Sequence, residues 1–442
     1  MGDPCVFPHQ AALTHLCCEY SEFSDIDRIE TAPGRPPNQY FYIRTKSGCG
    51  CAETGLGCQD YFVRSGEEDR DLRLRHDLLP RVAKKLAIYN QSLRTSDISD
   101  IKAWSPGAVF VTVPEPISPS LMVDVASDGA GAATCASCGC PVCEMLPRTP
   151  RVKSLNGLSV WRRLMGFVDF DWEQKHADWI AGTCAGIAAF NAALQDCSCL
   201  PCSDISPEDV ADRVKVPEWV KEHKNHWDEA DDLDYLLDHV RPMLSDLSFL
   251  VDAAGEHGVL VASRALALLV EHRKAYKSLP KQLTHGDLGL GNVMISPSSE
   301  NATVCIIDFT PYATESHLYA FTVTLYWTFL YGPLSSAGAG GTQDAAFLDE
   351  ERLRAAVAAY LTTADLYGLP DVRHMWYTMF VKVACRMLFV PVLWASSAEV
   401  EGAALPSFVC AEATEKYVRV LDWVMANRAT LQKMLDLDVD DA

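Results

Sequence analysis

The residues best suited to chemistry in this chain lie between His285 and Asp308. His285, Asp287 and Asn292 have the spacing His-x-Asp-x-x-x-x-Asn, and Asp308 follows an apolar run at residues 304–307. Phosphoryl transfer from a nucleotide requires a carboxylate that orients the attacking hydroxyl and accepts its proton, together with oxygen ligands for magnesium. Asp287 suits the first role, while Asn292 and Asp308 offer the hard oxygens that magnesium prefers. The pattern therefore predicts a phosphoryl-transfer site.

The same residues also have a purely structural interpretation. Two short strands joined by the turn-rich stretch at residues 296–299 would form a β-hairpin, whose polar residues would only cap turns. A lone His-x-Asp is a weak signal, but a second aspartate at the end of an apolar strand makes a chance match much rarer. The pairing of the two motifs favours the chemical interpretation.

His285-Gly286-Asp287, paired with Ile307-Asp308-Phe309, resembles the aminoglycoside phosphotransferase superfamily, which includes choline, hydroxylysine, methylthioribose and homoserine-type kinases. The Asp-to-Asn spacing also matches the catalytic loop of protein kinases, but those enzymes carry glycine where this chain has Thr310. Residues 318–327 resemble the homoserine kinase-like branch best.

The resemblance implies an α+β, bilobal protein kinase-like fold with a small β-rich N-lobe and a larger helical C-lobe. We expect a leader at residues 1–20, an N-lobe at 21–157 with a Cys-rich insertion at 127–148, and a C-lobe at 158–442. The implied activity is transfer of the ATP γ-phosphate, with Mg²⁺, to a hydroxyl of an amino alcohol, amino acid, sugar or aminoglycoside. His285 would then hold the catalytic loop through hydrogen bonds.

Three further residues are expected to bind the nucleotide by resemblance. Gly34 lies in a turn that resembles the superfamily's phosphate-covering loop, although a plain hairpin turn would look the same. Arg64 ends the third predicted strand, where the superfamily places a phosphate-binding lysine; arginine can bind phosphate bidentately. Leu155 belongs to residues 152–157, which resemble the hinge between the lobes.

Two departures from the superfamily pattern leave a second function open. The predicted helix at residues 78–93 contains no glutamate to orient the phosphate-binding cation. Ala320 stands where the homoserine kinase-like pattern has a buried aspartate that braces the catalytic loop. The alternative is therefore a catalytically inactive kinase-like protein that binds a nucleotide or a partner.

The 442-residue chain is acidic, with a formal net charge of −21. This charge argues against nucleic acid as a partner, because binding to a phosphate backbone requires clustered lysine and arginine. It likewise disfavours binding to anionic lipid. The simplest reason for the acidity is solubility, and the alternative is a cationic substrate such as an amine.

The sequence also predicts a protein with no membrane partner. The apolar stretch at residues 375–394 is interrupted by Lys382, Arg386 and Pro391, whereas a span needs about 20 apolar residues. The first residues lack the basic and apolar regions of a secretory signal. We therefore expect a cytoplasmic location.

Arg386 is a candidate for binding an anionic group, unless it is ion-paired or extends its charged end to solvent.

The chain has 17 cysteines, an odd number that excludes complete intramolecular pairing. Four of them are close enough in sequence to bind zinc through their thiolates, although structural zinc sites more often join two separated knuckles. Reduced thiols in a loop insertion are the alternative, and a thiol-rich scaffold is a third class of function. The four residues are Cys135, Cys138, Cys140 and Cys143.

Hydrophobic patterning predicts the elements that must position the site. The acidic stretch at residues 228–239 is expected to be a solvated helix face, with a cation-binding wall as the alternative. Apolar spacing of two or of three to four residues indicates strands and helices, respectively. Strands are predicted at 25–31, 40–44 and 61–64, and short apolar runs lie at 109–113 and 121–125. Helices are predicted at 78–93, 177–194, 318–330, 349–361, 372–394 and 413–435.

Overall fold

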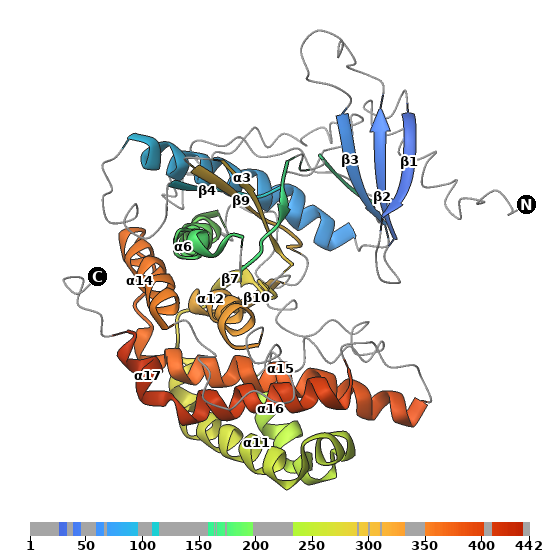
Figure 1. Ribbon diagram of the computed structural model, residues 1–442, viewed down its shortest axis with the longest axis vertical. Coiled ribbons are helices and arrows are strands. Elements are labelled where there is room, and N and C mark those ends of the chain that lie inside the picture. Colours follow the sequence, from blue (N-terminus) through green and yellow to red (C-terminus); the bar gives the residue numbers. More distant parts are fainter. Residues whose placement is uncertain are drawn as a thin grey trace, which may run out of the picture.

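The computed structural model describes residues 26–32, 39–45, 59–65, 69–95, 108–114, 158–162, 164, 166–172, 175–197, 233–289, 291–298, 301–309, 312–331, 350–401 and 409–435. The predicted leader, Gly34, Leu155 and the four clustered cysteines lie outside these residues. Figure 1 shows a small sheet at the upper right, a mixed layer of helices and strands in the middle, and long helices along the bottom.

The small sheet is antiparallel, with the strand order β1-β2-β3-β5. Ile43 and Val63 are buried on adjacent strands, as expected of the apolar residues that predicted β2 and β3. The three predicted strands of this region are confirmed, each within two residues of its expected ends. The bounds are β1 Ile26–Ala32, β2 Gln39–Thr45, β3 Gln59–Ser65 and β5 Leu158–Arg162.

A second four-stranded sheet lies in the middle layer, with the order β4-β9-β8-β6. Strand β4 runs parallel to β9, whereas β8 is antiparallel to both of its neighbours. On the other edge of β4, the Asn90 side chain makes two 2.9 Å hydrogen bonds with the backbone of Val111. The bounds are β4 Ala108–Thr112, β6 Val168–Asp169, β8 Val293–Pro297 and β9 Asn301–Ile306.

The pairing of strands therefore does not follow the lobe boundary expected at residue 157. Strand β4 precedes that boundary but pairs with β9, while β5 follows it and pairs with β3. Helices α3 (Asp69–Thr95) and α6 (Ile180–Cys197) pack on each other and on β4. The assignment of the lobes by residue number stays a prediction.

Helix α6 forms the centre of the middle layer, and it is buried along nearly all of its length. A short 3₁₀ turn, η2 (Ala177–Trp179), leads into it, so the predicted helix at 177–194 is confirmed with a tighter first turn. Helix α14 (Glu350–Leu366) packs along α6, and α12 (Leu318–Leu325) lies between α6 and the bottom layer.

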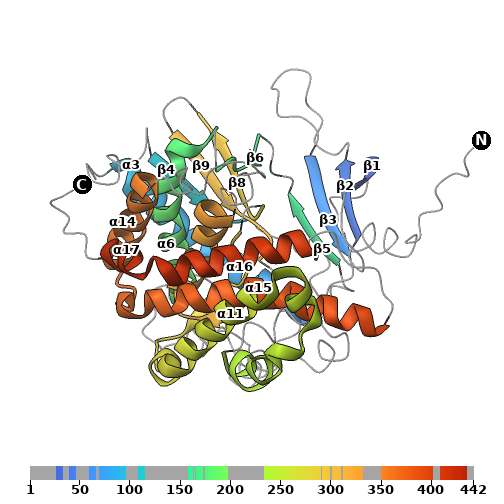
Figure 2. The ribbon, with the colours of Figure 1, turned by 60° about the horizontal axis from the view of Figure 1, so that its bottom comes forward.

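The long helices α11, α15 and α16 pack on one another in the bottom layer, which Figure 2 shows from its outer side. The single helix predicted at 413–435 is wrong, because α16 ends at Ala426 and α17 begins at Arg428. Between them Asn427 leaves the helical conformation, and its side-chain amide donates to the Trp423 carbonyl. The bounds are α11 Ser248–Lys277, α15 Trp376–Glu401, α16 Ala411–Ala426 and α17 Arg428–Lys433.

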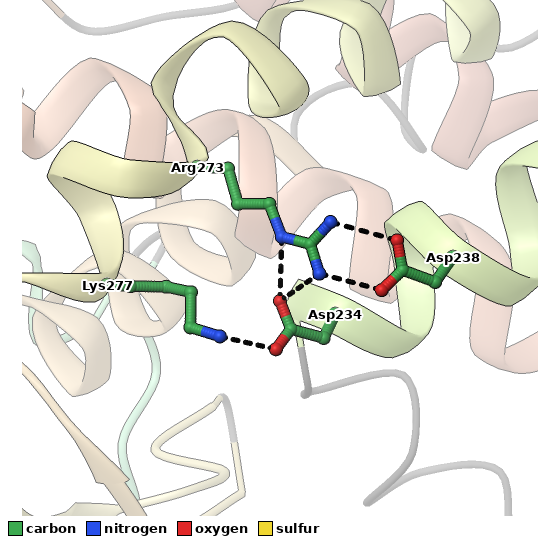
Figure 3. A network of polar contacts seen from close by, with 4 residues as sticks. All are labelled: Asp234, Asp238, Arg273 and Lys277. Atoms are coloured by element: carbon green, nitrogen blue, oxygen red, sulfur yellow. Dashed lines mark hydrogen bonds and ion pairs between the residues drawn. The ribbon is translucent and has the colours of Figure 1, made fainter.

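Residues 233–239 of the predicted acidic stretch are described, and the two carboxylates among them are paired with basic side chains. Arg273 on α11 makes bidentate contact with Asp238 and a further bond to Asp234, which Lys277 also contacts (Figure 3). These two aspartates therefore do not form an uncompensated cation-binding wall. They lie on the short turns α10 (Leu233–Tyr235) and η3 (Leu236–Val240), which are followed by η4 (Arg241–Asp246).

Two helical stretches, Ser248–Lys277 and Arg373–Leu393, are long and apolar enough to cross a membrane by composition. The second comprises the 3₁₀ turn η6 (Arg373–Met375) and most of α15, and its apolar window is completely buried among other helices. Such burial is what the core helix of a globular protein shows. Lys382 and Arg386 lie inside this buried segment.

Lys382 is compensated by a carboxylate from a small antiparallel sheet formed by β7 (Gln282–His285) and β10 (Tyr312–Glu315). Its ammonium lies 2.5 Å from Glu315 Oε1, and Tyr276 donates to Glu315 Oε2 at 3.1 Å. The rings of Tyr276 and Tyr319 flank the same ammonium.

With one β-rich part and a larger helical part, the expected bilobal α+β class is confirmed.

Candidate active site

The predicted catalytic loop (residues 286–292) connects β7 to β8. Two hydrogen bonds within the loop share one acceptor, the backbone carbonyl of Asp287. It accepts from Gly289 N at 2.9 Å and from Asn292 Nδ2 at 2.6 Å. Asn292 in turn accepts from the backbone of Ile307 at 3.0 Å, which ties the loop to the end of β9. Residues 20 positions apart in sequence are thereby held in one small cluster.

His285 is the buried centre of this cluster. Its Nδ1 accepts the backbone N–H of Asp287 at 3.2 Å, and its Nε2 lies 2.9 Å from the carbonyl of Ile307. One nitrogen accepts and the other donates, so the ring carries its proton on Nε2. Burial lowers the pKa of His285, although the Ile307 carbonyl and the charges of Asp287 and Asp308 act in the opposite direction. The ring is neutral and links both motifs.

Asp308 adopts a backbone conformation that is rare for residues other than glycine. Its φ is 53°, and such positions persist where the surrounding structure holds them in place, often at functional sites. The next residue, Phe309, is buried edge-on between His285 and Phe190, with ring centroids 5.5 and 5.9 Å away. Because Phe309 is anchored inward, the turn leaves Asp308 exposed on the outer side.

The donor atoms of this cluster fit a magnesium ion that is held by few protein ligands. The nitrogen of the Asn292 amide is engaged by the Asp287 carbonyl, so its oxygen is the atom left for a cation. Asp308 supplies an exposed carboxylate on the strand end beside it. The described residues contain no group of three or more His, Cys, Asp or Glu side chains that could hold a metal. Magnesium bound to phosphates needs only one or two carboxylates.

The predicted site residues fall into two groups. His285, Asp287, Asn292 and Asp308 are brought together at the ends of β7 and β9. Arg64 lies in β3, in register with Tyr40 and Ser159 of the small sheet, and the structure does not test its role. Gly34 and Leu155 lie outside the described residues, so their nucleotide contacts stay predictions.

Sequence reasoning missed the residues that hold the cluster from a distance. Phe190 comes from the middle of α6, and no motif marks it as a neighbour of Phe309. Ala320, where a bracing aspartate was expected, is fully buried in α12. Arg386 is also buried on α15, one helical turn after Lys382, and its role in binding an anionic group stays a prediction.

The profile of the phosphotransferase enzyme family (APH) matches residues 135–360. No curated protein sequence matches significantly.

Similar solved structures include three kinases. They are an amicoumacin kinase in complex with AMP-PNP and Ca²⁺ (12% identity, TM-score 0.48, 94% of both chains covered), a microcompartment-associated aminopropanol kinase (14%, 0.46, 96% of this chain and 98% of that chain), and the ethanolamine kinase of Plasmodium vivax (12%, 0.43, 93% and 85%).

Proposed function

Because the chain belongs to the phosphotransferase enzyme family, we propose that it transfers the γ-phosphate of ATP to a hydroxyl of a small metabolite. The observation that carries the proposal is the cluster in which neutral His285 joins the loop of Asp287 and Asn292 to the strand end of Asp308. This arrangement places a candidate base and two candidate magnesium ligands around one buried hub.

Asp287 is the group that acts on the acceptor. Its carboxylate is partly exposed at the start of the loop, while its backbone is fixed on both sides by His285 and Asn292. The acceptor oxygen attacks the γ-phosphorus, the bond to the β-phosphate oxygen breaks, and the acceptor proton passes to Asp287. ADP leaves as the other product. Fixing the backbone keeps the carboxylate oriented for this step.

Asn292 and Asp308 would hold magnesium against the nucleotide phosphates. Magnesium held there would supply positive charge against the charge that develops on the transferred group and the leaving oxygen. The hydrogen bond from Asn292 Nδ2 to the Asp287 carbonyl fixes the side-chain amide, whose oxygen would be the metal ligand. On the N-terminal side we propose that Arg64 contacts phosphate oxygens, that Gly34 lies over them and that Leu155 contacts the nucleotide.

The acceptor is proposed to be an amino alcohol, an amino acid, a sugar or an aminoglycoside. The test is transfer of label from γ-labelled ATP, with magnesium, to a panel drawn from these four classes. Asp287→Asn should lower kcat by about a hundredfold to ten-thousandfold, because its amide keeps the size of the side chain but cannot accept the proton. ATP affinity should stay near that of the wild type.

Asp178→Asn is the matched control, since Asp178 is an exposed aspartate on η2. The control should transfer label as the wild type does. If wild type and Asp287→Asn bind ATP equally and neither labels any acceptor, the transferase proposal fails. The inactive, nucleotide-binding alternative would then hold.

A further inference from the structure

We propose that Thr324 and Trp327 are positioning residues that hold the catalytic loop from the α12 side. The inference rests on the proposed function, and it assigns a loop-bracing role to residues without a charge. Helix α12 continues directly into a π-helical turn, η5 (Tyr326–Tyr331), and such turns often occur at functional sites. Ala320, Thr324 and Trp327 follow one another at helical spacing along one side of this segment.

Thr324 contacts the loop through its hydroxyl. Thr324 Oγ1 lies 2.7 Å from the carbonyl oxygen of Leu288 and 3.1 Å from that of Ala320. A hydroxyl has one proton, and the shorter contact assigns it to Leu288. Both Thr324 and Leu288 are buried, so this donor satisfies a carbonyl that water does not reach. The bonded carbonyl belongs to the residue directly after Asp287.

Trp327 contacts the next loop residue through its ring. A Cβ atom on Gly289 would lie 2.8 Å from Trp327 Cδ1 and 3.0 Å from Nε1, so the indole lies directly against the loop backbone. Any side chain at Gly289 would push the two apart. The indole is held in turn by Tyr331, whose ring centroid is 4.7 Å away and which stacks on Tyr417 of α16.

The helix that carries these two residues is itself anchored. Trp376 of α15 donates its Nε1 proton to Thr322 Oγ1 at 3.1 Å, and Thr322 donates to the Leu318 carbonyl at 2.6 Å. A loop that is held by a rigid helix keeps its reacting group within the narrow geometry that transfer requires. At Ala320 no carboxylate is present, and Thr324 reaches the loop one helical turn later.

The first test compares isosteric variants of buried threonines. Thr324→Val removes the hydroxyl, Thr324→Ser restores it, and Thr363→Val is the control. Thr363 is fully buried in α14, and its hydroxyl has no partner among the described residues. We expect Thr324→Val to lower kcat by up to about a hundredfold, as for a slightly misplaced reacting group. KM for ATP should match that of Thr363→Val, whereas Tm should fall below that of Thr363→Val because the buried Leu288 carbonyl loses its donor. Thr324→Ser should recover most of both losses.

The second test uses the contact between Gly289 and Trp327. Gly289→Ala should lower kcat because its methyl group meets the indole. Combining it with Trp327→Leu should give a more active enzyme than Gly289→Ala alone, because the smaller side chain removes the clash. Additive losses in the double variant would contradict the direct contact.

A measurement that does not depend on turnover can test this inference separately from the proposed function. Amide hydrogen exchange across residues 283–294 should be faster in Thr324→Val than in the wild type, and unchanged in Thr363→Val. If exchange is faster in Thr324→Val but the wild type labels no acceptor, the bracing role stands and the transferase proposal fails. Unchanged exchange with wild-type kcat, or a loss of Tm with no specific loss of kcat, would overturn the brace.

Discussion

The β7–β10 sheet has a polar cluster at each end, and the two clusters use their carboxylates in opposite ways. At one end, His285 pairs with Tyr312 and leads into the loop of Asp287. There the buried member is neutral, and the carboxylates of Asp287 and Asp308 remain in reach of solvent. At the other end, Glu315 is buried and bound by Lys382 and Tyr276.

The difference shows what makes a carboxylate available for chemistry. A buried carboxylate must be neutralised by a close cation and by hydrogen bonds, so its oxygens are occupied. A carboxylate at a loop edge stays accessible to a metal, a phosphate or a hydroxyl, provided that its backbone is fixed by neutral groups. Substitutions in the first cluster should therefore lower turnover, and substitutions in the second should lower the stability of the fold.

The largest effect is expected for Asp308→Ala, which should abolish transfer while the protein stays folded. The reason is the loss of the exposed carboxylate that we assign to magnesium. Asp308→Asn is the better matched variant, because asparagine tolerates the positive φ of this position as aspartate does. Turnover and Tm should be measured for both. Activity equal to the wild type at saturating magnesium would end the assignment.

Lys382→Met should destabilise the protein by about 3–5 kcal/mol, because it leaves the Glu315 carboxylate buried without its cation. Urea unfolding monitored by tryptophan fluorescence would measure the change. Pairing it with Glu315→Leu should recover much of the loss, since no uncompensated charge then remains. A double variant that is less stable than Lys382→Met would show that the pair is not isolated.

Acid should weaken the fold through its buried histidines. Burial lowers the pKa of His285 and His317 in the native protein, so the unfolded chain binds more protons below the usual histidine pKa of about 6.5. The free energy of unfolding should therefore decrease as pH falls through that value, and should level off above it. His317→Gln should reduce this dependence, whereas the exposed His374→Gln should not.

The smallest effect is expected for Arg273→Met, which makes the same kind of change as Lys382→Met on the surface. Arg273 and its partners Asp234 and Asp238 are substantially exposed, so water and salt replace most of what the pairs contribute. Its Tm should stay much closer to the wild type than that of Lys382→Met. A comparable loss in both variants would remove the distinction between the two ionic clusters.

The sequence was most informative where function constrains residues at short spacing. His285, Asp287, Asn292 and Asp308 were predicted as one site, and the structure brings them into one cluster. Local apolar patterning also predicted β1, β2 and β3, and Ile43 and Val63 are buried on the last two. Asn427 shows the limit of periodicity: the apolar pattern continues across it, but its side-chain hydrogen bond ends the helix.

By itself, the sequence predicted the bilobal α+β class and the phosphotransferase family, and it proposed residues for a chemical centre, since these depend on residue type and on spacing along the chain. Only the tertiary structure decided that β4 pairs with β9, that Glu315 meets Lys382, and that Thr324 and Trp327 lie against the loop. These contacts join segments dozens of residues apart. Their partners are chosen by packing and by the need to satisfy buried polar groups, which leave no periodic trace in the sequence.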